Sequence, residues 1–242
     1  MPDLLCQREV PTVEDVKLLK AWLDECDSKH TKSCAPNNSE LSLPDRLIDI
    51  RSVKKQKIIT TEELSKDTKY VALSHRWGDM PEEAVTTPVN IANRMKRSIP
   101  TEELTQNFRD AIAITAVLGI KYLWIDSLCI LQGPQGDFNE QADKMQTTFS
   151  GAYCVLAACS AKESNRGFLK KELYPSVKVG DFYLSPVTND FERDVLNSPL
   201  NSRGWVLQER ALARRTIFFT DTQIYWECGD GIRSETLARL KK

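Results

Sequence analysis

Apolar and polar positions along the chain predict strands that alternate with helices. Residues 12–27 carry apolar side chains at helical spacing behind Thr12, and the segments RLIDI and KIITTEEL after them indicate two short strands. YVALS (70–74) is a continuous apolar run with the length of a buried strand. Residues 101–119 predict a capped helix, and KYLWID (121–126) predicts the next buried strand. A strand, a helix and a second strand form a βαβ unit, which pairs its strands in parallel.

The same rhythm continues and then changes near residue 170. DFNEQADKMQTTFSGA (137–152) predicts a helix and YCVLAACSA (153–161) a strand, whereas the later segments are short and typical of antiparallel strands around a helix at 204–213. We therefore expect an α/β fold with a flavodoxin-like parallel sheet core flanked by helices. An N-terminal preamble of a helix and strands (1–66) should pack on this core, and the main domain (67–242) should end in a mixed α+β extension.

Composition narrows the choice of partners and compartment. The chain has 33 basic and 34 acidic residues, so no overall field attracts nucleic acid or an anionic membrane, and we expect neither as a partner. No apolar run approaches the ~20 residues of a membrane span, and the first ten residues lack the pattern of a signal peptide. The 7 cysteines are an odd number, which favours reduced thiols over a disulfide framework. These features predict a cytoplasmic protein.

Two polar segments follow the predicted parallel strands directly. HRWGD comes after YVALS, and DSLCI comes after KYLWI. Ligands of open α/β sheets bind beyond the carboxyl ends of the strands, so these segments mark a candidate pocket. Arginine can clamp a phosphate or carboxylate, histidine can titrate near neutral pH, and tryptophan offers a flat face to an aromatic ligand. The candidate residues are Ser74, His75, Arg76, Trp77, Gly78, Asp126, Ser127 and Cys129.

A structural interpretation of the same residues stays open. Trp77 could close the end of the core, and Arg76 could pair with Asp79 or Asp126. Ser127 and Cys129 could also suggest a nucleophile, but the surrounding sequence does not resemble the turn that exposes a hydrolase nucleophile. A hydrolase triad is therefore not favoured.

Several segments together resemble the HET domain, the heterokaryon incompatibility domain of filamentous fungi. They are YVALSHRWGD, TPVNIANRM, DAIAITAVLGIKYLWIDSLCILQ, DFNEQADKM, AYCVLAACSA and SRGWVLQERALARRTIFFT with QIYWEC. The resemblance runs from about residue 70 to residue 235, and WLDECDSKHTKSC with LPDRLIDI resembles the segment that often precedes this domain. It implies a fungal cytosolic effector of programmed cell death, with incompatibility sensor proteins as partners.

YVALSHRWGD also resembles the first motif of TIR domains, and HET domains look like distant relatives of the TIR fold, so the resemblance implies a TIR-like sheet core. Some TIR domains cleave NAD⁺ and are activated by self-association. This resemblance implies NAD⁺ or a related nucleotide as substrate, no other cofactor, and a homo-oligomer when active. The TIR carboxylate is a Glu on a helix, and the comparable segment here is DFNEQADKM, where Phe138 stands for a Trp and Gln141 for the Glu. An amide lacks the charge that would stabilise a developing cation, so this chain is expected to be slow or inactive. The true counterpart could instead be Glu140, or Gln141 could be a solvated helix position.

Two functional questions about the C-terminal part and the whole chain stay open. Arg203 could contribute to a phosphate site, or an arginine could pair with Glu209 to fasten the C-terminal extension to the core. The whole chain could also act as a non-enzymatic module that recruits partners through a TIR-like surface.

A metal site is considered and not favoured. Cys26, His30 and Cys34 lie at positions i, i+4 and i+8, which would place three possible ligands on one stripe of a helix. A structural zinc ion generally takes four ligands, and the only spare candidate nearby in the sequence is Cys6. We therefore expect ordinary packing here and no metal.

Overall fold

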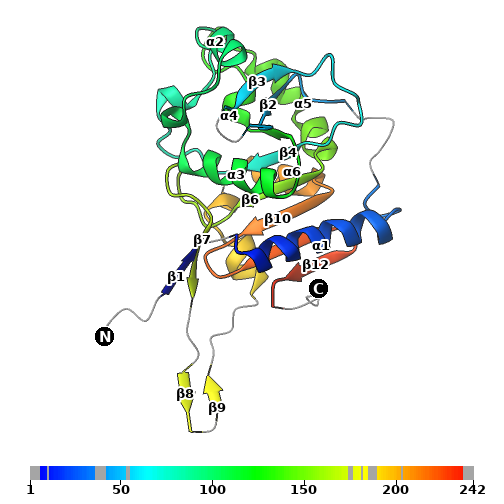
Figure 1. The fold of residues 1–242 in the computed structure, drawn as a ribbon, viewed down its shortest axis with the longest axis vertical. Helices are drawn as coiled ribbons and strands as arrows, with labels where there is room; N and C mark the ends of the chain where they lie inside the picture. Colours follow the sequence, from blue (N-terminus) through cyan, green and yellow to red (C-terminus); the bar gives the residue numbers. More distant parts are fainter. Residues whose placement is uncertain are drawn as a thin grey trace.

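The computed structural model describes residues 6–9, 11–35, 42–52, 55–173, 177–180, 182–184, 190–202 and 204–236. Its main sheet has eight strands in the order β12-β11-β10-β6-β4-β5-β2-β3, and helices flank it (Figure 1). Two small two-stranded ribbons, β1-β7 and β8-β9, lie below the sheet in Figure 1. The predicted α/β class is confirmed.

The central strands are parallel, as the sequence predicts for the first three. They are β4 (Val71–Ser74), β5 (Tyr122–Trp124), β6 (Cys154–Ala158) and β10 (Arg215–Phe219). β4 lies between β5 and β6, and β10 pairs with the other side of β6, all in parallel. The expectation of a purely antiparallel strand at 215–220 is wrong, because this strand is parallel to β6 on one side and antiparallel only to the strand that follows it. In order of their appearance along the chain these strands are arranged 2-1-3-4, which is the flavodoxin-like order. The order reverses at β4, so the rule for open sheets places a ligand beyond the end of this strand.

Helices and short turns connect these strands. Between β4 and β5 lie η1 (Glu82–Ala84), α2 (Ile91–Lys96), η2 (Thr101–Glu103) and α3 (Gln106–Val117); between β5 and β6 lie α4 (Asp126–Cys129) and α5 (Phe138–Gly151). The helix predicted from residue 101 begins later, because Thr105 and not Thr101 provides the cap. The Thr105 side chain accepts a hydrogen bond from the Phe108 N–H, while Leu104 before it is extended.

The N-terminal segment contributes to the sheet. α1 (Val13–Lys29) begins at the predicted cap, where Thr12 and Asp15 form a reciprocal capping box. β2 (Arg46–Asp49) and β3 (Lys57–Thr60) then pair with each other, and β2 also pairs antiparallel with β5. The two predicted short strands are confirmed, and they extend the main sheet directly beside β5.

The C-terminal segment continues the opposite side of the sheet. η3 (Glu192–Leu196), η4 (Leu200–Ser202) and α6 (Gly204–Leu212) precede β10, and β11 (Ile224–Cys228) and β12 (Gly231–Ser234) follow it as antiparallel strands. The ribbons are built from β1 (Cys6–Glu9) with β7 (Lys170–Leu173) and from β8 (Val177–Val179) with β9 (Phe182–Leu184). The predicted mixed extension is therefore attached to the parallel core through the pairing of β10 with β6.

One apolar core joins both flanking segments to the central strands. Trp22 of α1 lies against Trp226 of β11 with ring centroids 6.1 Å apart, and both side chains are buried. Burial of large aromatic side chains is the strongest single packing term in a core. None of the helices in the described ranges is long and apolar enough to cross a membrane.

Candidate active site

The two polar segments predicted at the strand ends meet in the structure. Ala72 of β4 lies opposite Trp124 of β5 in a parallel pair, so both strands end at the same edge. Beyond that edge the Trp77 Nε1–H donates a hydrogen bond of 2.8 Å to Oδ2 of Asp126. The buried His75 lies beside them, with its Nδ1 3.9 Å from Oδ1 of Asp126. The prediction that these two strands are parallel neighbours ending side by side is confirmed.

The loop after β4 is held in a tight turn that presents Trp77 and Arg76. Trp77 is half-buried and Arg76 is exposed. The Ser164 hydroxyl donates to the carbonyl oxygen of Trp77 at 2.8 Å. Gly78 has a φ of +56°, and a Cβ there would lie 2.8 Å from Cβ of Glu163, so both the backbone angle and the close approach require glycine. Within the described ranges Arg76 forms an ion pair with neither Asp79 nor Asp126.

A buried carboxylate from the C-terminal segment completes this edge. The Ser74 hydroxyl, at the last residue of β4, donates a short hydrogen bond to Oε2 of Glu209 on α6. Glu209 is only 4% exposed. The sequence gives no spacing rule that connects residue 74 with residue 209, so it predicts Glu209 only as an anchor for the extension. We call Ser74, His75, Trp77, Asp126 and Glu209 the carboxyl-edge site.

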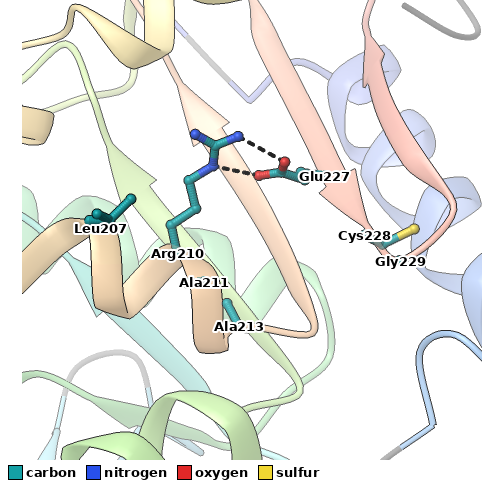
Figure 2. A pocket seen from close by; sticks show the side chains of 7 residues that line it. All are labelled: Leu207, Arg210, Ala211, Ala213, Glu227, Cys228 and Gly229. Carbon is teal, nitrogen blue, oxygen red and sulfur yellow. Dashed lines mark hydrogen bonds and ion pairs between the residues drawn. The ribbon is translucent and has the colours of Figure 1, made fainter. Parts of the chain in front are cut away.

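The anchoring role belongs to the neighbouring arginine. Arg210 forms two parallel hydrogen bonds with the Glu227 carboxylate, at 2.7 and 2.8 Å, which fasten α6 to β11 (Figure 2). Arg203 lies outside the described residues.

Ser127 and Cys129 support the edge but are poorly placed as nucleophiles. The Ser127 N–H donates to Oδ1 of Asp126 at 2.7 Å, so both oxygens of this carboxylate accept hydrogen bonds. Burial raises the pKa of the Cys129 thiol to about 12, which keeps it protonated at neutral pH. The Cys129 carbonyl accepts from Nε of Arg46 at 2.7 Å and so helps to fix the start of β2.

Gln141 lies at the same edge of the sheet, over β2, and is 6% exposed. Its Nε2 donates to Oδ2 of Asp45 at 2.7 Å, and the Lys144 ammonium lies 2.9 Å from the same oxygen. Burial opposes the charged form of Asp45, but hydrogen bonds from Lys144 and Gln141 outweigh it and hold the pKa of Asp45 below its usual value. The interpretation of Gln141 as a solvated position is therefore wrong.

Glu140 points the other way. Its side chain is 67% exposed and pairs with Lys144 at 3.0 Å along the helix surface. Of the two neighbouring positions, Gln141 is the one that faces the protein. A carboxylate at the carboxyl edge is supplied instead by Asp126, whose side chain is 15% exposed, and by the more deeply buried Glu209.

The predicted metal candidates lie elsewhere. Cys26, His30 and Cys34 come together, but the cysteine that joins them is Cys228 at the end of β11, whereas Cys6 lies on β1. Cys228 also borders a cavity of about 350 Å³ between α6 and β11 (Figure 2). Sequence reasoning missed Cys228 because nearly two hundred residues separate it from Cys34, and only the register of β10 and β11 brings it close.

Comparison with known proteins identifies a family for the central part of the chain. A family model described as heterokaryon incompatibility protein (HET) matches residues 70–209, which is more than half of the chain. The match begins just before β4 and ends at Glu209, so it spans every residue of the carboxyl-edge site. No curated protein and no solved structure matches the chain closely enough to count as a relative.

Proposed function

The chain belongs to the heterokaryon incompatibility (HET) family, and we propose that its carboxyl-edge site cleaves the nicotinamide glycosidic bond of NAD⁺ to cause incompatibility-triggered cell death. The observation that supports this activity is that two carboxylates accept hydrogen bonds from residues at the carboxyl end of β4, Glu209 from Ser74 and Asp126 from Trp77. Glycosidic cleavage passes through an oxocarbenium-like state, which a nearby carboxylate stabilises.

The proposed chemistry uses the charge and shape of this edge. The bond between the ribose carbon and the pyridinium nitrogen breaks, and neutral nicotinamide leaves with the bonding electrons. Water then adds to the ribosyl cation and loses a proton. Asp126 is suited to face the cation, because Trp77 and the Ser127 N–H hold its two oxygens in place. The Trp77 ring would stack on an aromatic base, and the exposed Arg76 would bind the pyrophosphate.

Gln141 makes the proposed enzyme slow. The amide stands where the TIR resemblance implies a glutamate. It carries no negative charge that could stabilise the positive charge developing on the ribose in the transition state. We propose that turnover therefore depends on Asp126 and Glu209 and rises when chains self-associate.

The direct test is to incubate the purified chain with NAD⁺ at low and high protein concentration and to measure released nicotinamide. Asp126→Asn and Glu209→Gln keep the shape of each side chain and remove its charge. Each should lower the rate by about 10²–10³-fold, the usual effect of losing one preorganised electrostatic contact. Asp79→Asn is the matched control, because Asp79 is an exposed acid on the same loop, and it should leave the rate unchanged.

A second function has its own supporting observation. Trp77 and His75 both lie against Asp126. The helix α6, which is bonded to Ser74 through Glu209, exposes Leu207 by 73%, and we propose that this exposed side chain belongs to a surface that recruits partners. If neither the chain nor Gln141→Glu releases nicotinamide at any concentration, the NAD⁺ proposal fails and the interaction module replaces it. Leu207→Asp should then abolish cell killing without any change in cellular NAD⁺.

A further inference from the structure

Three possible metal ligands lie on one face at the end of α1. The His30 N–H bonds to the Cys26 carbonyl at 3.1 Å, and the Cys34 N–H bonds to the His30 carbonyl at 2.9 Å. Each of these is the hydrogen bond of one α-helical turn, so the chain keeps helical spacing from Cys26 to Cys34 although α1 ends at Lys29. Side chains one turn apart lie one above the other.

β11 brings a fourth ligand to this face. The sulfur of Cys228 lies 3.5 Å from Nδ1 of His30, and the four ligand atoms of Cys26, His30, Cys34 and Cys228 all lie within 4.8 Å of one another. In Figure 2 the Cys228 sulfur points away from the Arg210–Glu227 pair, toward the blue helix α1. We call these four residues the thiol cluster.

The spacing fits a tetrahedral zinc ion. Zinc–sulfur bonds of about 2.3 Å and zinc–nitrogen bonds of about 2.0–2.1 Å place tetrahedral ligand atoms about 3.5–3.8 Å apart. The distance between Cys228 and His30 already has this value, and the limit of 4.8 Å leaves about 1 Å of adjustment for the other pairs.

Neighbouring groups orient the ligands as in known zinc sites. Nε2 of His30, the nitrogen that faces away from the cluster, lies 3.5 Å from the Asp230 carboxylate. A carboxylate behind a histidine fixes which ring nitrogen carries the proton and leaves the other free to bind a metal. The Asp230 N–H also points to the Cys228 sulfur at 3.5 Å. A Cβ on Gly229 would lie 2.4 Å from the Ser33 carbonyl oxygen, so glycine permits this close approach.

A buried arginine lies next to the thiol cluster. Arg215 lies directly opposite Cys228 in the β10–β11 pair and is 4% exposed. One nitrogen of its guanidinium pairs with Asp27 at 2.5 Å, whereas Nε and Nη1 have no hydrogen-bond partner within the described chain. Three thiolates and a neutral histidine around a zinc ion carry a net charge of −1, which would stabilise this arginine.

We propose that the thiol cluster is a structural zinc site that ties α1 to the end of β11. Three sulfurs and one imidazole form a ligand set typical of zinc, and four protein ligands leave no open position for catalysis. All four ligands lie outside residues 70–209, so the ion would join the segments that precede and follow the family match. This inference does not depend on the proposed NAD⁺ cleavage.

The first experiment measures metal content and stability of the full chain purified without chelators. We expect one zinc ion per chain, a large fall in melting temperature when a strong chelator removes it, and recovery with zinc but not with magnesium. Cobalt should replace zinc and give the intense visible absorption of tetrahedral thiolate coordination. Binding should release the thiol protons, so apparent affinity should fall as the pH is lowered.

Matched variants separate coordination from packing. Cys228→Ser should lose the zinc ion, whereas Cys159→Ser changes another buried free cysteine outside the cluster and should keep it. His30→Cys replaces one ligand by another and should also keep it. Asp230→Ala should weaken zinc binding by about 10–100-fold, the usual effect of removing a group that orients a ligand.

Three results would overturn the proposal. The first is a folded chain that holds no zinc and takes up no cobalt. The second is a zinc content that Cys228→Ser leaves unchanged, because the ion would then be bound elsewhere. The third is a disulfide among the cluster cysteines in the chain purified under reducing conditions, detected by mass. If Cys228→Ser does not fold, the cobalt spectrum of the unmodified chain and the zinc content of His30→Cys decide the question.

Discussion

The carboxyl-edge site and the thiol cluster lie at opposite edges of one sheet. The first lies beyond the ends of β4 and β5, and the second lies beside Arg215, where the parallel strand β10 begins. At the carboxyl edge the polar groups form separate pairs, such as Trp77 with Asp126, that hold each charge in position. In the thiol cluster the ligand atoms converge on one point. Hydrogen-bonded pairs of side chains fix the position of each charged group, whereas ligand atoms that converge on one point suit the binding of a metal ion.

Two contacts hold α1 against β11: the packing of its apolar face and, in our proposal, the zinc ion. A substitution in the core distinguishes them. Trp22→Ala removes a ring buried against Trp226, one turn before Cys26. We expect a loss of about 3–5 kcal/mol in the free energy of unfolding, as for other large aromatic side chains. Urea unfolding with and without a chelator measures it. If zinc fastens α1 independently, the loss should persist in the zinc-bound chain while zinc content stays at one per chain.

A pair of glycine substitutions tests the two edges against each other. Gly229→Ala places a Cβ against the Ser33 carbonyl, and Gly78→Ala combines a φ of +56° with a contact to Glu163. Each should cost about 1–3 kcal/mol of stability, measured by urea unfolding. Gly229→Ala should weaken zinc binding and leave nicotinamide release unchanged. Gly78→Ala should slow nicotinamide release and leave zinc binding unchanged.

The control for Gly78→Ala is a glycine that also has a positive φ but has no close contact. Gly119 has a φ of +79°, and a Cβ added there would meet nothing within 4 Å, so Gly119→Ala should show the cost of the backbone angle alone. Equal effects of Gly78→Ala and Gly229→Ala on both readouts would show that the two edges are not independent.

The sequence predicted the carboxyl edge because its residues follow their strands directly. YVALS and KYLWID are apolar runs that predict buried strands, and the polar segments HRWGD and DSLCI follow these strands directly. Local pattern fails where a distant segment supplies a partner. Glu209 reaches Ser74, and Cys228 reaches Cys34, through strand pairings that no spacing along the chain encodes. The later start of α3 is a smaller failure, since Thr101 and Thr105 are both chemically suitable caps.

Gln141→Glu tests what a charge at the carboxyl edge costs. The new carboxylate would face Oδ2 of Asp45, where the amide now donates at 2.7 Å. Two adjacent carboxylates raise the pKa of one of them above its unfolded value, so the variant should lose stability as the pH rises through about 4.3. We expect a loss of about 1 kcal/mol at neutral pH, since Lys144 offsets part of the repulsion, and almost none at pH 4.

The unmodified chain should show the opposite trend. The pKa of Asp45 is lowered in the folded state, so its contribution to stability is present at neutral pH. This contribution is lost as the pH falls through the folded-state pKa of Asp45. Urea unfolding from pH 3 to 7 measures both curves. Glu140→Gln is the control, because its exposed pair with Lys144 contributes only about 0.3–0.5 kcal/mol. If the NAD⁺ site uses a carboxylate at position 141, Gln141→Glu should release nicotinamide faster despite its lower stability.

Trp77→Phe is the smallest change that addresses the pairing of groups at the carboxyl edge. It keeps an aromatic face for a ligand but removes the Nε1–H that donates to Asp126 at 2.8 Å. A hydrogen bond to a charged partner contributes about 1.5–3 kcal/mol when buried, and the half-buried position of Trp77 reduces this to about 1 kcal/mol. Asp126 would keep the Ser127 N–H but lose the contact that fixes its second oxygen. The maximal rate of nicotinamide release should therefore fall, with little change in the Michaelis constant. The zinc content should not change. A raised Michaelis constant with an unchanged maximal rate would show instead that Trp77 binds the substrate and does not position Asp126.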